Sequence, residues 1–243
     1  FLERLDMPPY KIASGDLRNT PLLKHVAAFK KPMFVSSGAA TLDDVRRAYD
    51  TIAPINTHLC LMQCTAGYPA DWDELNLGVI ARYRELFQDT VIGFSSHDNG
   101  IAMAMAAYVL GARAIEKHFT LNRAMKGTDH AFSLEPVGLR KMVRDLSRVR
   151  AALGDGQKRP FPSEVAPGIK MGKKLVAARA LPAGHVLARD DIAIKSPGDG
   201  VPPYELDNVL GCALLEPLAE DDDVVLNRLT KAVDNEQHVR ARR

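Results

Sequence analysis

Residues 91–120 read VIGFSSHDNGIAMAMAAYVLGARAIEKHFT, and this stretch decides the fold class. Two short apolar runs, at residues 91–95 and 113–117, flank the longest apolar run of the sequence, residues 101–110. A histidine follows each short run, and these two, His97 and His118, are 21 residues apart. One strand and one helix fill about that length, so we predict a βα repeat that brings both histidines to the same edge of a parallel sheet.

The same pattern continues toward the start of the chain. Further strand-like runs lie at residues 11–14, 33–36 and 59–64, and the starts of the five runs are 22 to 32 residues apart. Helix signals separate them, such as Thr41 with Asp44, which resembles a capping box. Alternating strands and helices predict a parallel sheet covered by helices, either an open doubly wound sheet or a closed (β/α)₈ barrel.

Two observations favour the barrel. No Gly-x-Gly-x-x-Gly motif follows a strand, which argues against a dinucleotide-binding sheet. Each predicted strand also ends in hydrogen-bonding or reactive side chains, and barrel enzymes place their active sites at these carboxyl ends. Only five of eight strands are recognisable, so a barrel requires three more that precede Phe1.

The composition changes after Gly154, where prolines and glycines replace apolar residues. Short strand-like runs then follow at residues 175–178, 192–194 and 224–225. We predict four parts: a barrel domain, a linker, a small β-rich domain and a basic tail, at residues 1–154, 155–173, 174–230 and 231–243.

Bulk properties point to an ordinary globular enzyme. The 243 residues are 46% hydrophobic and carry a formal net charge of +2, which indicates neither a nucleic-acid nor a membrane partner. The three cysteines are too few for a disulfide framework, and no run approaches the roughly 20 apolar residues that span a bilayer. We therefore expect a cytoplasmic protein.

Several side chains at the predicted strand ends suit chemistry, although each also has a structural interpretation. His97 and His118 suit a divalent metal, or they serve as hydrogen-bonding groups or as an acid and a base. Lys11 and Lys117 lie in apolar strands and each needs an anion, supplied by an ion pair or by an anionic substrate. The candidate partners for an internal ion pair are Asp16 and Glu116.

Hydroxyl groups gather at the same edge. Ser14, Ser36, Ser37 and Ser95 suit binding of phosphate or carboxylate oxygens, or they cap helices. Tyr68 suits stacking on a sugar ring or packing of its loop. The carboxylate of Asp129 suits hydrogen bonding to sugar hydroxyls, or it stabilises a turn in its loop. Taken without any relative, these residues predict a metal-assisted barrel enzyme that acts on small anions.

The motifs themselves resemble a known family. YKIASGD (residues 10–16), SSG (36–38), CTAGYP (64–69), GFSSH (93–97) and IEKHFT (115–120) resemble, in order and spacing, the barrel motifs of the N-acetylneuraminate (sialic acid) synthase family. LGDG at residues 153–156, the proline-rich linker and residues 174–226 are similar to its C-terminal antifreeze-like (SAF) domain, a β-clip fold.

The resemblance implies a (β/α)₈ TIM barrel that condenses phosphoenolpyruvate with an N-acetylmannosamine-type aldose, giving a nonulosonic acid and phosphate. It implies a divalent metal, usually Mn²⁺, held by His97 and His118. It also implies a homodimer in which the SAF domain of one chain caps the barrel of the other. The substrate-binding residues would be Lys11, Ser14, Ser36, Ser37, Tyr68 and Ser95. The catalytic residues would be Asp16, Lys117 and Asp129. In this family the first three strands supply a further catalytic Glu and a phosphate-binding Lys, so we expect residues 1–243 alone to be inactive.

Four positions depart from the family pattern. Asp16 stands where Glu is usual, Ala66 where Asn is usual, Ser96 where Asp is common, and Ser196 where some members have an Arg that reaches the sugar. The identity of the aldose therefore stays open. Two other functions stay open as well: a non-catalytic carbohydrate-binding or assembly fragment, and a metal-dependent barrel aldolase or hydrolase that does not use phosphoenolpyruvate.

Overall fold

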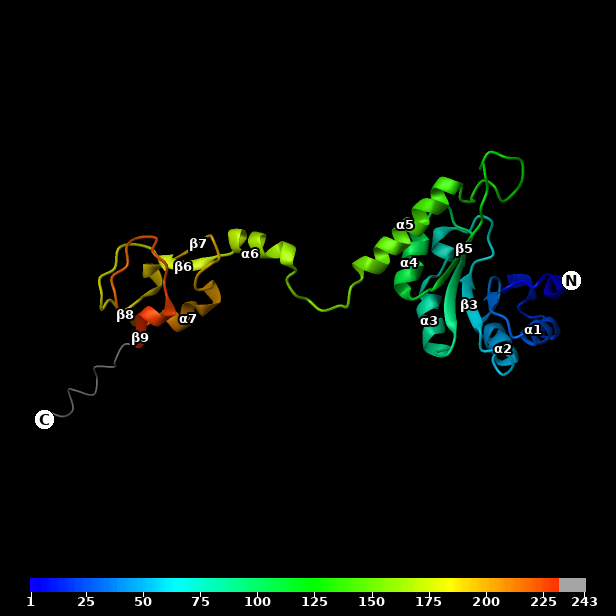
Figure 1. Cartoon of the computed structure of the whole chain (residues 1–243), viewed down its shortest axis with the longest axis horizontal. Helices are drawn as coiled ribbons and strands as arrows, with labels where there is room; N and C mark the ends of the chain where they lie inside the picture. The colour runs from blue at the N-terminus through cyan, green and yellow to red at the C-terminus, as the bar shows by residue number, and fades with distance from the viewer. Residues whose placement is uncertain (232–243) are drawn as a thin grey trace. The chain divides into compact units, whose positions relative to one another are not determined.

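The computed structural model describes residues 1–231, which divide between Gly156 and Gln157 into two compact units (Figure 1). Of the basic tail predicted for residues 231–243, only Lys231 is among the described residues. No helix within residues 1–231 is long and apolar enough to cross a membrane.

The first unit is built on a sheet of five parallel strands in the order β1-β2-β3-β4-β5. Because the strand order never reverses, crossovers of one hand place the connecting helices on one face of the sheet. Consecutive helices pack together, α1 on α2, α3 on α4 and α4 on α5. Strands β1 to β5 are, in order, Tyr10–Ile12, Met33–Ser36, Leu59–Cys64, Val91–Ser96 and Ala114–Lys117. Helices α1 to α5 are, in order, Thr20–Ala27, Leu42–Ile52, Gly78–Leu86, Ala102–Leu110 and Pro136–Ala152.

Local sequence signals set the helix ends. The capping box predicted for Thr41 and Asp44 is confirmed, since the Asp44 amide donates to Thr41 Oγ1 and the Thr41 amide to Asp44 Oδ2. Helix α1 begins after Asn19, whose side chain accepts from the Leu22 amide. Helix α4 ends at Gly111, whose φ of 115° is one that residues with a Cβ rarely adopt.

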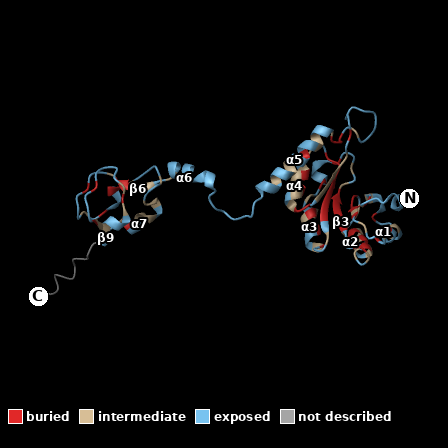
Figure 2. Ribbon diagram, in the orientation of Figure 1, coloured by how far each residue is buried: buried red, intermediate tan, exposed pale blue. Residues whose placement is uncertain are grey.

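The apolar core lies between the sheet and the helices (Figure 2). Side chains alternate along a strand, so every second residue faces the helices. The helix-facing residues are apolar and almost fully buried: Tyr10, Ile12, Met33, Val35, Leu59, Leu61, Ile92 and Phe94. The intervening residues face the other side of the sheet, and they include most of the polar side chains that the sequence places in strands.

The second unit contains two antiparallel strand pairs, β6 (Lys174–Ala177) with β7 (Ile192–Lys195), and β8 (Cys212–Leu214) with β9 (Leu229–Lys231). The strand-like runs at 175–178 and 192–194 are confirmed. The strand expected at 224–225 is wrong, because Val224 is instead a buried loop residue of the core. Two helices, α6 (Val165–Met171) within the expected linker and α7 (Leu206–Val209), complete the unit.

Seven short 3-10 helices connect these elements within residues 1–231. They are Leu2–Leu5, Ser14–Asp16, Trp72–Glu74, Pro162–Glu164, Arg189–Asp191, Pro203–Glu205 and Leu226–Arg228.

Asp191 is the main buried charge of the second unit. Its carboxylate accepts from Arg179 at 2.6 Å, from His185 at 2.7 Å and from the Ala188 amide at 2.9 Å. The Ala188 amide, followed by His185, holds the pKa of Asp191 below its ordinary value of 3.8. A carboxyl with a lowered folded-state pKa stabilises the fold above its ordinary pKa, and this contribution is lost as the pH falls through the lower value.

Replacing Asp191 with asparagine is expected to destabilise the second unit by about 1–3 kcal/mol at pH 7, because its three donors lose a buried, charged acceptor. The difference between wild type and variant should shrink below pH 4, as the wild-type carboxyl becomes protonated. Scanning calorimetry at pH 7 and pH 3 measures both effects. Asp190→Asn, at the exposed neighbour, is the control, and an equal destabilisation by both variants would contradict the prediction.

Candidate active site

The polar face of the first sheet ends in a pocket. Side-chain alternation places residues 11, 36, 64, 95 and 116 on the face away from the core, near the carboxyl ends of their strands. The pocket has a volume of about 280 Å³. Its lining consists of Lys11, Ala13, Ser14, Ser36, Cys64, Tyr68, Ser95, Ser96, His97, Glu116, Lys117 and His118.

The ring of His97 is held in one orientation. Its Nδ1 lies 2.7 Å from the backbone carbonyl oxygen of Thr65, and the Tyr68 ring lies over it with a centroid distance of 4.2 Å. A carbonyl oxygen only accepts, so Nδ1 donates and the neutral ring keeps its lone pair on Nε2. Burial alone would lower the pKa of His97, but Cys64 and the Thr65 carbonyl raise it above the ordinary value.

His118 lies beside His97, with ring centroids 5.1 Å apart. Burial, with His97 as the next cause, lowers the pKa of His118, which favours the neutral ring. Its Nδ1 is 3.7 Å from Asp129 Oδ2. Metal-binding histidines usually have one ring nitrogen oriented by a carbonyl or carboxylate, as Nδ1 of His97 is here, and the two adjacent rings fit a divalent metal. Among residues 1–231 no group of three or more His, Cys, Asp or Glu side chains forms a fuller cage.

Lys11, Ser95 and Glu116 form a charged cluster in the pocket. Glu116 Oε2 accepts from Ser95 Oγ at 2.7 Å and lies 3.4 Å from Lys11 Nζ. Lys11 also donates to the carbonyl of Ile12 at 3.1 Å. The side chain of Lys11 is 34% exposed, so its ammonium group can reach a second anion in the pocket. The internal ion pair and the anion site, which the sequence left as alternatives for Lys11, are thus compatible.

Two hydroxyl groups complete the anion-binding side. Ser36 Oγ is buried and is one of two buried side-chain atoms without a hydrogen-bond partner in residues 1–231. Ser14 Oγ accepts from the Gly38 amide at 2.9 Å and lies 3.6 Å from Cys64 Sγ. Because a buried hydroxyl without a partner is costly, Ser36 indicates that the pocket binds a hydrogen-bonding ligand.

Lys117 is bound within the protein. Its ammonium nitrogen lies 3.0 Å from Ser96 Oγ, 3.0 Å from Asp98 Oδ1 and 2.5 Å from the Asp98 carbonyl. The side chains of Lys117 and Asp98 are only 3% and 2% exposed. Burial lowers the pKa of Lys117, and Asp98 offsets part of that effect.

Three predicted site residues are outside the pocket lining. Ser37 is buried but donates to the Met62 carbonyl at 2.9 Å and accepts from Tyr83, because it points opposite to its neighbour Ser36. Asp16 is exposed and accepts from Asn19 at 3.3 Å. Asp129 is exposed too, in the loop after β5, where it lies near His118.

Sequence reasoning missed three neighbours of the histidines. Cys64 Sγ is 3.9 Å from His97 Nδ1, and the Phe132 ring is 4.9 Å from that of His118. Asp98 is the ion-pair partner of Lys117. Cys64 ends β3 at the same edge as Ser95, so its position offered a signal, whereas Phe132 comes from a loop that no periodicity describes.

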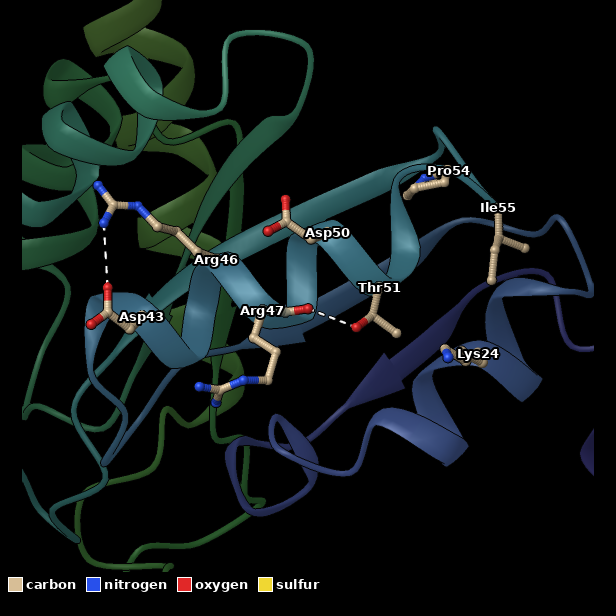
Figure 3. Close-up of a pocket in the computed structure, with 8 residues that line it drawn as sticks. All are labelled: Lys24, Asp43, Arg46, Arg47, Asp50, Thr51, Pro54 and Ile55. Carbon is tan, nitrogen blue, oxygen red and sulfur yellow. Dashed lines mark hydrogen bonds and ion pairs between the residues drawn. The ribbon is translucent and has the colours of Figure 1, made fainter.

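A larger hollow of about 600 Å³ lies over α1 and α2, away from these residues (Figure 3). Its arginines already have acidic partners, since Arg46 pairs with Asp43 and Arg47 with Asp44. The buried atoms without partners in residues 1–231, Ser36 Oγ and Asp98 Oδ2, are both elsewhere. We assign no chemistry to this hollow.

Two protein-family models match this chain. Residues 1–158 match the NeuB family, and residues 174–229 match the SAF domain. The chain belongs to the NeuB family. This family and the parallel half-barrel of the first unit are consistent with a TIM barrel followed by a SAF domain.

Several NeuB-family relatives are similar over most of the chain. N-acetylneuraminate-9-phosphate synthase of Homo sapiens is 39% identical over 97% of this chain and 65% of its own length. N,N'-diacetyllegionaminic acid synthase of Legionella pneumophila is 33% identical over 88% of this chain and 61% of its own length. The chain thus spans less than two thirds of these two relatives.

A solved structure shows a similar fold. The spore coat polysaccharide biosynthesis protein SpsE of Bacillus subtilis superposes with a TM-score of 0.62 and 30% identity, covering 96% of this chain and 70% of its own.

Proposed function

We propose that the protein condenses phosphoenolpyruvate with an amino-sugar aldose of the N-acetylmannosamine type, forming a nonulosonic acid and releasing phosphate. The observation that carries the proposal is the pocket itself, in which Lys11 and the unpartnered hydroxyl of Ser36 lie beside two imidazoles. Relatives named as synthases of N-acetylneuraminate 9-phosphate and diacetyllegionaminic acid support it.

In the proposed reaction, C3 of phosphoenolpyruvate forms a bond to the aldehyde carbon of the open-chain sugar. The aldehyde oxygen takes up a proton, water adds to C2, and the C2–phosphate linkage breaks to give the keto acid and inorganic phosphate. A divalent metal held by His97 and His118, Mn²⁺ in this proposal, would supply Lewis-acid polarisation of the aldehyde. Lys11, Ser14, Ser36 and Ser95 would bind the phosphate and carboxylate oxygens.

The remaining predicted site residues take weaker roles in the proposal. Tyr68 lies against both histidine rings and would border the sugar. Asp129, near His118, would act on the sugar or on the metal-binding ring. Asp16, predicted to be catalytic, and Ser37, predicted to bind substrate, do not line the pocket, and their roles stay predictions.

We also propose that the NeuB and SAF units act together in a homodimer, with the SAF domain of one chain over the barrel of the other. Light scattering of the intact protein gives its mass and tests the dimer.

The three cysteines are free thiols, which supports a reducing, cytoplasmic location.

Phosphate release tests the function. The intact protein is assayed with Mn²⁺, phosphoenolpyruvate and a panel of N-acetylmannosamine, its 6-phosphate, mannose and diacetamido-trideoxyhexoses. Release that needs both phosphoenolpyruvate and one sugar would support the synthase and identify the aldose. Release without phosphoenolpyruvate would favour an aldolase or hydrolase, and carbohydrate binding without release would favour the binding fragment.

Gly38 provides a finer test of the anion-binding side. A Cβ added there would lie 2.8 Å from Ser14 Oγ and 3.1 Å from Cys64 Sγ, closer than such atoms normally approach. Gly38→Ala is therefore expected to displace Ser14 and to raise the KM for phosphoenolpyruvate about tenfold, which corresponds to about 1.4 kcal/mol. Gly15→Ala, where nothing lies within 4 Å of the added Cβ, is the control. An unchanged KM in Gly38→Ala would remove Ser14 from the proposed site.

A further inference from the structure

A buried polar network lies directly behind the two histidines. Residues 96 and 117 are paired neighbours at the ends of β4 and β5. Ser96 and Asp98 flank His97 in the sequence, and Lys117 precedes His118. Because side chains alternate along a strand, Ser96 and Lys117 point to the opposite side of the sheet from Ser95 and Glu116.

This network uses every hydrogen of the Lys117 ammonium group. The three N–H groups match three acceptors, namely Ser96 Oγ, Asp98 Oδ1 and the Asp98 carbonyl, at 3.0, 3.0 and 2.5 Å. Ser96 Oγ in turn donates to Asp98 Oδ1. Lys117 therefore has no donor left for a substrate, although it contributes to the pocket lining.

We infer that Ser96, Asp98 and Lys117 form a clamp that positions His97 and His118 for metal binding. The inference rests on the proposed function, in which these histidines hold the metal. The clamp joins the backbone on both sides of His97 to the residue before His118. Both charges are almost fully buried, so a backbone rotation at either histidine would leave a buried charge without its partner.

This role differs from the catalytic role that the family resemblance implies for Lys117. The three clamp residues act through the histidines and are positioning residues. Groups that orient metal-binding histidines typically contribute a factor of about 10 to 100 in metal affinity. We expect the clamp to contribute a factor in this range.

The test is the dissociation constant for Mn²⁺, measured by titration calorimetry on the intact protein. Asp98→Asn alone leaves Lys117 buried without an anion, so this variant is at risk of not folding. The double variant Asp98→Asn with Lys117→Met removes both charges together, and Ser96→Ala removes one hydroxyl while leaving the ion pair. Asp44→Asn is the matched control, because Asp44 is an ion-paired carboxylate of the same unit that lies outside the pocket.

The double variant is expected to raise the Mn²⁺ dissociation constant about 10- to 100-fold, and Ser96→Ala a few-fold. Circular dichroism and thermal unfolding establish that each variant is folded, and the visible spectrum of bound Co²⁺ should change in the double variant. Wild-type affinity in a folded Ser96→Ala protein and in a folded double variant would overturn the inference. So would wild-type protein that binds no Mn²⁺.

Phosphate release, measured separately, distinguishes this inference from the proposed function. If wild type binds Mn²⁺ and the clamp variants bind it more weakly, but no sugar gives phosphate release, the clamp inference stands and the synthase proposal is removed. If wild type releases phosphate but the clamp variants bind Mn²⁺ with wild-type affinity, the synthase proposal stands and the clamp inference is overturned.

Discussion

Replacing His97 with alanine is expected to lower sugar-dependent phosphate release on the order of 10³-fold, the upper range for losing one group that stabilises transition-state charge. The ring is one of two imidazoles in the pocket, and the Thr65 carbonyl and Tyr68 ring hold it in place. Alanine removes the nitrogen lone pair proposed to bind the metal. No other histidine within residues 1–231 lines the pocket apart from His118.

The assay compares His97→Ala with wild type at saturating substrates over a range of Mn²⁺ concentrations. The Mn²⁺ concentration that gives half of the maximal rate should be higher for the variant than for wild type. His58→Ala is the control, because His58 is an exposed histidine just before β3, at the opposite end of that strand from the pocket. Retention of more than a tenth of the wild-type rate by His97→Ala would be incompatible with a metal-binding role.

The positions of His97 and His118 could be predicted because they depend only on the sequence spacing of one βα repeat. That spacing places both residues at the carboxyl edge of a parallel sheet, and the structure brings their ring centroids to within 5.1 Å. Lys11 and Ser95 follow from the same argument, since each lies on the polar face of a strand.

The prediction gave two adjacent residues one role. Ser36 and Ser37 were both predicted to bind substrate, yet neighbours in an extended segment point to opposite sides. Ser36 faces the pocket and Ser37 donates to the Met62 carbonyl. Applying the period of two to each strand end would have separated these roles from sequence alone.

Other features depend on contacts that sequence spacing does not specify. The ion pair between Lys117 and Asp98 requires the β4–β5 register and the path of the loop after β4. Phe132 reaches His118 from an irregular loop. In the second unit, Val224 was predicted in a strand because a two-residue apolar run fits a strand and a buried loop equally well.

Lys11→Met is expected to lower kcat/KM for phosphoenolpyruvate about 100-fold, or roughly 3 kcal/mol, the upper range for one hydrogen bond to a charged group. The effect should be large because Lys11 has two functions in the pocket. It would attract the substrate anion, and it offsets the charge of Glu116, 3.4 Å away. In the variant the Glu116 carboxylate would face the incoming phosphate without compensation.

Lys31→Met is the matched control, since Lys31 is also paired with carboxylates, those of Glu3 and Asp6, but does not line the pocket. Initial rates at varied phosphoenolpyruvate concentration give the comparison. If Lys11→Met and Lys31→Met had equal values of kcat/KM, Lys11 would have no role in anion binding.

The two functions of Lys11 can be separated by a double-mutant cycle with Glu116→Gln. Lys11 and Glu116 are in contact, so their effects should not add. If repulsion from the exposed carboxylate causes part of the loss, Lys11→Met with Glu116→Gln should recover phosphoenolpyruvate affinity relative to Lys11→Met alone. Glu116 also holds Ser95 at 2.7 Å, so the recovery should be incomplete. Strict additivity would mean that Glu116 does not oppose the phosphate and that Lys11 acts through direct attraction alone.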